Sequence, residues 1–516
     1  MIALDHARRR PAANIDLLEP DGNWCPMAHC NRLDDSFQQL PPLRQPRTVQ
    51  RLEDARVSPY GFIHLGSFTG ERMAVCTYAA PSRPALAAYD YRDGSTLWLS
   101  PLEDLPGLPR RIPSGVLIAR MARDGGAPRR VVFAANPAEF VAYRADGTRL
   151  WKKSTREITP VSPNGIGIPI SISFTDSNAI VAATSSGWIV KLDPTDGRTI
   201  DAYRMTTFAA VDGRLHPGTL VTMKSPIVIG DVMYLLAEFR PDAAAPLPSI
   251  ARPVYVVRIE LSQPSVRGRE RTIRPITSPT DARDQCPDRA FVGVVRGRGS
   301  PPALVCRDGR VLIFAHAHTV SNGRLWPVIA GIVDDGGVLR RRWVTTLDVM
   351  KGDSVHSAPA LHAASGTLLV TTYTKMFAFS SVGSLSGSVP SPSPLAATTL
   401  MSLASSPRVA RVGFGSPFAL TFDADNNEIV AYTNFRAFPN GGVHCYGYLG
   451  AFAVPLGRRQ APRPLWSRPL GFTAAGRPIP SPGTFGQPAL FRYDSGRQAS
   501  TGLIVNTVYT GTYMIK

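Results

Sequence analysis

The sequence predicts an all-β protein, a β-propeller in which four-stranded antiparallel sheets repeat around a ring. Three observations predict this fold. A proline-headed hairpin recurs along the chain, a second hairpin with an Asp-Gly type turn recurs beside it, and glycines and prolines fall between short apolar runs. Two hairpins supply four antiparallel strands per unit. Units of that size, repeated many times, are typical of a propeller.

The first hairpin is clearest at residues 225–236, where two apolar runs flank a tight Gly-Asp turn. Related stretches follow prolines whose spacing runs from 57 residues (Pro169 to Pro226) to 76 residues (Pro226 to Pro302). The prolines that head these stretches are Pro169, Pro226, Pro302, Pro359, Pro417 and Pro488. A nearly regular spacing favours one repeat array over several unrelated domains.

The second hairpin is clearest at 141–151, Val-Ala-Tyr-Arg-Ala-Asp-Gly-Thr-Arg-Leu-Trp, and at 188–200. Looser copies occupy 330–343 and 451–466. Each predicts a hairpin whose closing strand ends in an aromatic or aliphatic side chain. Combining both hairpins, we expect units that begin near residues 60, 113, 166, 223, 300, 357, 415 and 485. This gives eight blades, with seven as the alternative.

The two ends of the chain differ from this pattern. Residues 1–55 are polar and proline-rich, and we expect an irregular N-terminal arm packed on a propeller of residues 56–516. The last stretch, 506–515, is strand-like, so strands from both ends of the body are expected to pair and remove the open sheet edge. No apolar run reaches the roughly 18 residues of a transmembrane span. Residues 1–20 show no apolar signal-peptide core. We also expect the protein to be a monomer.

Charge and cysteines leave several alternatives open. The formal net charge is +18, which can attract nucleic acid or anionic surfaces, or can simply be dispersed over the surface. No motif that reads DNA or RNA is present, so we do not expect nucleic acid as a partner. Cys25 and Cys30 fit a small disulfide loop or half of a metal site, and Cys286 and Cys306 fit a bridge. Buried free thiols are the alternative for all four.

The repeat motifs also carry a family likeness. The stretch 143–151, together with Leu-Asp-Pro-Thr-Asp-Gly-Arg-Thr-Ile at 192–200, resembles the repeat of the quinoprotein-like (PQQ-like) β-propellers. The strand openings at 225, 300, 357 and 416 resemble it as well, and Trp24 to Gln39 is similar to a segment that often precedes such propellers. The resemblance covers nearly all of the chain. It implies a fold shared by dehydrogenases and by scaffold proteins of outer-membrane assembly, and it implies a periplasmic or secreted location.

The sequence departs from the dehydrogenases of that family. They carry an adjacent cysteine pair, a calcium site of Glu, Asn and Asp, and a tryptophan beneath the quinone. This chain has no Cys-Cys pair, and no such calcium ligand set can be assembled from it. We therefore expect no bound pyrroloquinoline quinone (PQQ), calcium or other metal. A quinone-dependent dehydrogenase with PQQ and calcium is the alternative that rests on the family resemblance alone.

In a propeller, the residues just before each innermost strand surround the mouth of the axial channel. Seven candidate residues occupy these positions: Arg111, Asn164, Lys224, Arg298, His356, Phe414 and Phe485. His356 is a catalytic candidate, and the other six are candidates for ligand binding. Four of the seven are basic or titrate to a cation, and none is acidic. Converging cations favour a carboxylate, phosphate or sulfate, so we predict that the mouth binds a small anionic molecule or a protein segment. Solvated loop charges are the alternative.

An enzyme that uses the same pocket is the second reading. Lys224, Arg298 and His356 would orient a carboxylate, and His316 or Glu238 would transfer protons in cofactor-independent chemistry, such as that of a lyase or isomerase. Glu238 and His316 can pair only if they face the same cavity. His316 and His318 lie on one face of a strand, which suits a metal, but no third ligand is identifiable, and histidines satisfied by neighbouring backbone are the alternative. No nucleophile elbow, phosphate loop or dinucleotide fingerprint is present.

Overall fold

The computed structural model describes part of the 516-residue chain. The described residues are 15–18, 38–52, 67–70, 72–79, 84–103, 115–123, 126–158, 166–211, 214–222, 225–242, 254–262, 270–272, 291–292, 303–306, 309–321, 324–349, 353, 355, 358–380, 382, 392–395, 409–414, 418–439, 446–456, 462–470, 488–494, 499–507 and 511–516. Within these ranges nearly every element is a strand, and the one helix is α1 (Thr155–Ile158). None of the described helical structure is long and apolar enough to cross a membrane.

The first half of the chain forms three sheets. One sheet contains β3 (Ser67–Gly70), β4 (Met73–Ala79), β5 (Pro84–Asp90) and β6 (Thr96–Pro101). The next contains β7 (Gly115–Arg123), β8 (Arg129–Ala135), β9 (Glu139–Arg144) and β10 (Arg149–Ser154), with β1 (Ile15–Leu18) added beside β7. A nine-stranded sheet contains β11 (Pro169–Phe174), β12 (Ile180–Thr184), β13 (Trp188–Leu192), β14 (Thr199–Val211), β15 (Arg214–Val221), β16 (Ile227–Ile229), β17 (Val232–Pro241), β18 (Val254–Glu260) and β19 (Glu270–Thr272).

The second half forms four more sheets within the described residues. One contains β20 (Phe291–Val292), β21 (Ala303–Val305), β22 (Val311–Ser321), β23 (Arg324–Asp335) and β24 (Val338–Thr346), and the next contains β25 (Ala360–His362), β26 (Thr367–Thr371), β27 (Met376–Phe379) and β28 (Pro392–Leu395). A further sheet contains β29 (Val409–Phe414), β30 (Ala419–Asp423), β31 (Glu428–Pro439), β32 (Tyr446–Pro455) and β33 (Arg463–Leu470). The last contains β34 (Ala489–Asp494), β35 (Ala499–Thr507) and β36 (Gly511–Ile515), together with β2 (Val49–Leu52).

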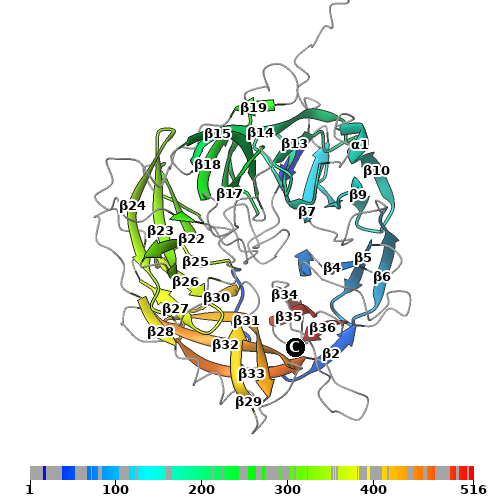
Figure 1. The fold of residues 1–516 in the computed structure, drawn as a ribbon. Helices are drawn as coiled ribbons and strands as arrows, with labels where there is room; N and C mark the ends of the chain where they lie inside the picture. Colours follow the sequence, from blue (N-terminus) through cyan, green and yellow to red (C-terminus); the bar gives the residue numbers. More distant parts are fainter. Residues whose placement is uncertain are drawn as a thin grey trace, which may run out of the picture.

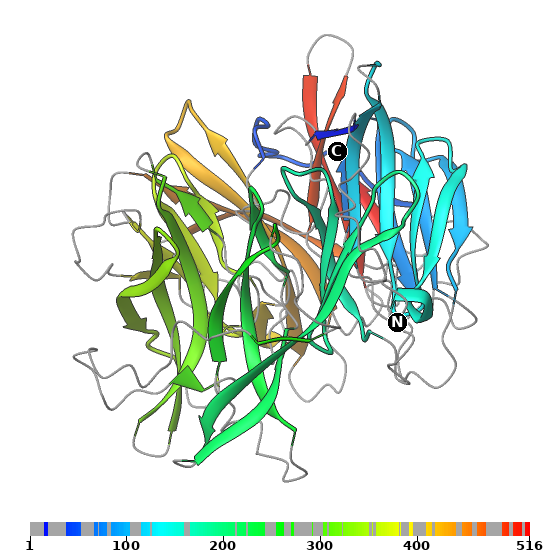
Figure 2. The same ribbon diagram turned by 90° about the horizontal axis from the view of Figure 1, so that it is seen from above.

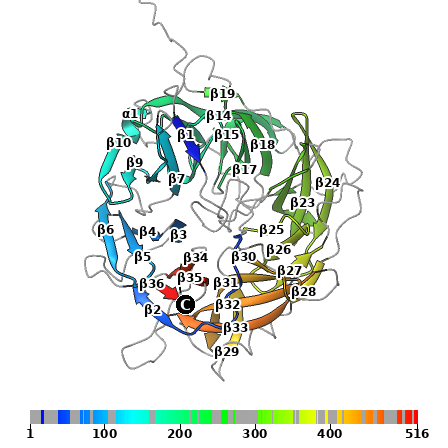
Figure 3. The same cartoon turned by 180° about the vertical axis from the view of Figure 1, so that it is seen from behind.

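The sheets stand around a common axis and follow one another in chain order, so the protein is a β-propeller (Figure 1). The ribbon seen from behind shows β7, β25, β30 and β34 toward the centre, and β6, β10, β24 and β28 at the periphery (Figure 3). Within a sheet, therefore, the chain begins near the axis and moves outward strand by strand. Figure 2 shows the ring from its side, with strands that run from one end of the ring toward the other.

The predicted hairpins are confirmed. Residues 227–229 and 232–234 pair as β16 and β17 around Gly230, whose φ of 61° is the positive value that the Gly-Asp turn requires. The Asp-Gly hairpins pair as β9 with β10 and as β13 with β14. The local turn chemistry thus sets the register of these strand pairs.

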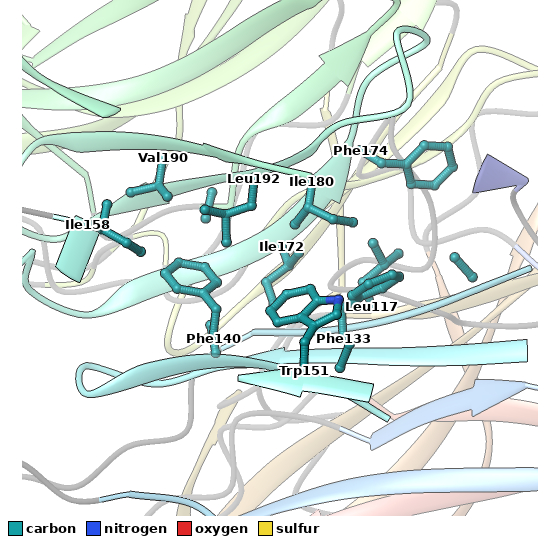
Figure 4. Close-up of a cluster of buried hydrophobic side chains, with 14 of the residues drawn as sticks. Leu117, Phe133, Phe140, Trp151, Ile158, Ile172, Phe174, Ile180, Val190 and Leu192 are labelled. Atoms are coloured by element: carbon teal, nitrogen blue, oxygen red, sulfur yellow. The ribbon is translucent and has the colours of Figure 1, made fainter. Parts of the chain in front are cut away.

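Buried apolar side chains fill the spaces between successive sheets. Among the described residues they form eight clusters, each of which joins one group of strands to the next. Figure 4 shows one cluster, in which Phe133 and Trp151 of the β7–β10 sheet pack against Ile172, Ile180 and further side chains of β11–β13. Inner strands such as β5 and β12 are buried along their whole length, because other sheets cover both of their faces. The outermost strands β6 and β10 keep several residues exposed or half-buried.

Tryptophans lock neighbouring sheets together. Trp98 at the end of one sheet donates its indole N–H to the carbonyl of Ala145 in the next sheet at 3.0 Å, and its ring lies against Gly147. Trp151 repeats the contact with the carbonyl of Pro194 at 2.8 Å and with Gly197. Both glycines have a positive φ, and a Cβ at either would lie within 2.6 Å of the indole. The Asp-Gly turn therefore serves its own hairpin and also seats the tryptophan of the preceding sheet.

The ring is closed by pairing of terminal strands, but the N-terminal one comes from residues 1–55 and not from the body as expected. β2 pairs antiparallel with β36 and becomes the outermost strand of the last sheet. Leu52 on β2 then contacts Gly94 of the first sheet, in the manner of the tryptophans at other junctions. β1 and β2 both lie within residues 1–55, so part of the segment expected to be irregular is strand.

Residues 38–52, which we call the closing segment, reach β2 from the interior of the ring (Figure 3). The backbone N–H of Gln38 donates to the carbonyl of Leu420 on β30 at 2.9 Å. Its side-chain amide exchanges two hydrogen bonds with the backbone of Leu490 on β34, at 3.1 and 2.9 Å. Gln38 is fully buried and ties the innermost strands of the last two sheets to each other.

The closing segment then runs outward between those two sheets. Leu43 lies in the cluster between them, and its carbonyl accepts the indole N–H of Trp466 at 2.9 Å. Arg44 binds the carboxylates of Asp423 and Glu428, which face each other across β30 and β31. Burial opposes ionisation of Asp423, but the Arg44 guanidinium and Asn426 outweigh it and lower the pKa of that carboxyl. The segment thus fills a junction with both apolar and ionic contacts.

Replacing Gln38 tests how much this junction stabilises the ring. Gln38→Ala leaves the backbone N–H of Leu490 buried without its acceptor, so the free energy of unfolding should fall by about 1–3 kcal/mol. Guanidinium unfolding followed by tryptophan fluorescence measures the change. Gln39→Ala, at the exposed neighbouring position, is the matched control and should shift the value by no more than about 0.5 kcal/mol. Equal effects of the two substitutions would contradict this role of Gln38.

His362 should make stability depend on pH. Burial lowers its pKa, and its ring stacks on Phe422 with centroids 5.3 Å apart. Since the unfolded chain binds the proton more readily, this contribution is complete above the ordinary histidine pKa of about 6.5 and is lost as pH falls toward the folded value. His362→Phe should therefore lose less stability than the wild type between pH 7.5 and pH 5. A pH slope of His362→Phe equal to that of the wild type would contradict this role of His362.

Candidate functional site

The candidate site lies at the end of the ring where the first strand of each sheet begins. We call this the leading end, and we call the chain before each first strand a leading segment. Because the sheets are antiparallel meanders, the turn between the second and third strands lies at the same end. Side chains from both kinds of connection can therefore approach the axis together.

Most of the predicted ligand-binding residues lie outside the described residues. These are Arg111, Asn164, Lys224, Arg298, His356 and Phe485. Phe414 is described, as the last residue of β29. It is fully buried within the cluster between the β25–β28 and β30–β33 sheets, where its ring meets Phe452 edge-on at 6.1 Å. Its side chain belongs to the core, while its backbone lies in a leading segment.

Three leading segments contain strands that the sequence did not predict. β15 pairs with the far end of β17, β20 with β22, and β29 with β31. Each added strand lengthens a sheet at the leading end. The available signal was the length of the second strands, since β17, β22 and β31 have 10, 11 and 12 residues. A hairpin whose first strand has three to five residues needs a second strand of only similar length.

Glu238 lies near the end of β17 and is buried, with its carboxylate 3.5 Å from Nε of Arg240. Side chains alternate along a strand, so Glu238 shares the face of Tyr234 and Leu236. These two pack in the cluster with Ile313 of the β21–β24 sheet. Glu238 is therefore on the side of β17 that faces that sheet.

His316 lies on β22 and is also buried. By the same alternation it shares the face of Leu312 and Phe314, which pack against the β25–β28 sheet. Glu238 and His316 thus belong to opposite sides of the β21–β24 sheet. The arrangement does not bring them together as an acid–base pair.

Two further carboxylates reach the leading end, and sequence reasoning missed both. Glu139, at the start of β9, accepts the backbone N–H of Glu103 at 2.6 Å and lies 3.7 Å from Nζ of Lys152. Burial raises its pKa. Asp353 lies before β25 and binds the turn between β26 and β27. Neither position shows a local sequence pattern, because the partners of each carboxylate come from other parts of the chain.

The described residues show no ligand set for a metal ion, and three of the described tryptophans serve the core. No group of three or more His, Cys, Asp and Glu side chains among them is arranged to hold a metal ion. The two cysteines whose side chains are described, Cys76 and Cys306, are not adjacent in the sequence and do not form a Cys-Cys pair. Trp98, Trp151 and Trp466 pack between sheets and donate to backbone carbonyls, so they do not form the floor of an axial cofactor site.

The separation of Glu238 from His316 can be tested directly. If the β21–β24 sheet lies between them, Glu238→Gln and His316→Gln should change the free energy of unfolding additively, within about 0.5 kcal/mol. Urea unfolding of the wild type, both single variants and the double variant gives the coupling energy. A coupling above about 1 kcal/mol would show that the two side chains interact.

No family model and no curated protein matches the sequence. Solved structures do match, at low identity. A europium-containing methanol dehydrogenase is 10% identical, with 95% of this chain and 90% of that chain covered and a TM-score of 0.49. The quinohemoprotein alcohol dehydrogenase from Comamonas testosteroni is 9% identical (96% and 80% covered, TM-score 0.41), and BamB from Moraxella catarrhalis is 12% identical (91% and 96% covered, TM-score 0.39). The solved structures that this chain is similar to are therefore quinoprotein-like β-propeller proteins.

Proposed function

We propose that this protein binds a small anionic ligand, or an acidic segment of a partner protein, at the leading end of the propeller and without a bound quinone. The observation that carries the proposal is the position of the seven candidates along the chain. Each precedes the first residue of an inner strand by three (Lys224 before Ile227) to five (Arg298 before Ala303) residues. Since those strands begin at one end of the ring, their leading segments converge there.

The charges of these residues support an anion as the ligand. Arg111, Lys224 and Arg298 are cations, His356 can become one, and none of the seven is acidic. Cations gathered at the mouth of a low-dielectric ring focus a positive potential on its axis. Arginine also binds carboxylates and phosphates through two parallel hydrogen bonds.

The finer architecture belongs to the same proposal. We infer eight four-stranded blades, counting the nine-stranded sheet as two blades with additional strands. Eight clusters between successive strand groups support this count. We further infer an arm of residues 1–55 that docks on a propeller of residues 56–516 and lends β2 to its last blade.

Catalysis is the weaker alternative. An acid–base enzyme in the same pocket would need proton donors and acceptors that face one cavity. Glu238 and His316 lie on opposite sides of a sheet, which favours binding without chemistry.

Sulfate tests the binding proposal, because it is a small anion whose charge is constant near neutral pH. Sulfate should raise the melting temperature of the wild type more than chloride at equal ionic strength. Lys224→Ala or Arg298→Ala should each weaken the sulfate affinity about tenfold, the equivalent of about 1.4 kcal/mol. Differential scanning fluorimetry over a sulfate titration measures both effects.

Arg144→Ala is the matched control, since Arg144 is an exposed arginine in the β9–β10 turn, at the opposite end of the ring. It should leave the sulfate response unchanged. A wild type that responds equally to sulfate and chloride, or a response lost equally in all three variants, would overturn the proposal.

A further inference from the structure

We propose that Asp353 is a positioning residue of the anion site, and that it acts through the turn Thr372–Lys375. This turn connects β26 to β27 at the leading end, and it contacts two leading segments. One carries His356 and the other ends at Phe414. The inference rests on the proposed binding function.

Asp353 is buried at 8% exposure, and its carboxylate is surrounded by donors from the turn. Oδ1 accepts the backbone N–H of Tyr373 at 2.8 Å. Oδ2 accepts the hydroxyl of Thr372 at 2.9 Å, and both the N–H and the hydroxyl of Thr374. A carboxylate with this many donors forms charge-assisted bonds that hold the turn in one geometry.

This contact differs from those of Asp146 and Asp193, the aspartates of two Asp-Gly hairpin turns. Asp146 and Asp193 accept N–H groups two residues further along the chain, within their own turns. The partners of Asp353 lie 19 to 21 residues away on a different connection. Asp353 therefore fixes one part of the leading end to another, whereas the other two only stabilise local turns.

The first leading segment follows directly from this anchor. Val355 forms an isolated antiparallel bridge with Thr372, and its side chain is buried in the cluster shared with Phe377 and Phe379. Asp353 and Val355, which both precede His356 in the chain, are thus held by the turn. We infer that this restraint extends to His356, the residue that follows Val355.

The second leading segment docks on the same turn. The N–H of Phe414 donates to the carbonyl of Tyr373 at 2.9 Å. The Tyr373 ring lies over Gly413, where a Cβ would come within 2.5 Å of the ring. Only glycine permits this approach without a shift of the ring. One turn therefore sets the relative positions of two neighbouring leading segments.

Hydrogen–deuterium exchange tests the structural part of the inference without any ligand. In Asp353→Ala, peptides that cover 353–358 and 409–414 should both exchange at least about tenfold faster than in the wild type. Asp353→Asn, which keeps the size and one acceptor oxygen, should give an intermediate change. Asp193→Ala, the control at the other end of the ring, should leave both peptides unchanged. Unchanged exchange at 409–414 in Asp353→Ala would overturn the inference.

A double-mutant cycle on sulfate affinity tests the functional part. If Asp353 acts through His356, Asp353→Ala and His356→Ala should each weaken sulfate binding several-fold, and the double variant should be no weaker than the weaker single. The effects of Asp353→Ala and Lys224→Ala should instead multiply. Multiplying effects of the Asp353 and His356 substitutions would overturn the positioning role while the binding function stands. No sulfate binding by the wild type would overturn both.

Discussion

The ring depends on the pairing of β2 with β36. A circular array of sheets must join its last member to its first, and an unjoined sheet would present an open edge. Here a strand from near the start of the chain completes the last sheet and places Leu52 against Gly94 of the first. Gln38 and Arg44 of the same segment hold the preceding junction. Because one stretch of chain completes the last sheet and contacts the first, the row of sheets becomes a closed ring. The leading end therefore has a fixed circumference.

The sequence predicted what is local and missed what is distant. Turn residues such as Gly147 and Gly230 reveal hairpins because the requirement for a positive φ acts within a few residues. Gln38 and Asp353 carry no comparable signal, since their partners lie 452 and about 20 residues away. Phe414 shows a related limit. Its place before an inner strand was read correctly, but an aromatic ring at that depth is buried in the core in preference to the channel.

The contacts that join adjoining sheets differ between the two ends of the ring. Tryptophan–glycine contacts and the turn aspartates serve the end opposite the leading segments. The leading end instead carries added strands and the Asp353 anchor. The loops and added strands of the leading end can thus vary in sequence while the opposite end preserves the ring.

The β14–β15–β17 connection gives the ring an uneven stiffness. Elsewhere adjoining sheets meet mainly through side chains, whose contacts can slide, but here backbone hydrogen bonds cross the boundary in both β14–β15 and β15–β17. Such bonds have a fixed register and resist shear. The strands on the two sides of β15 are therefore expected to move together as one unit of the ring.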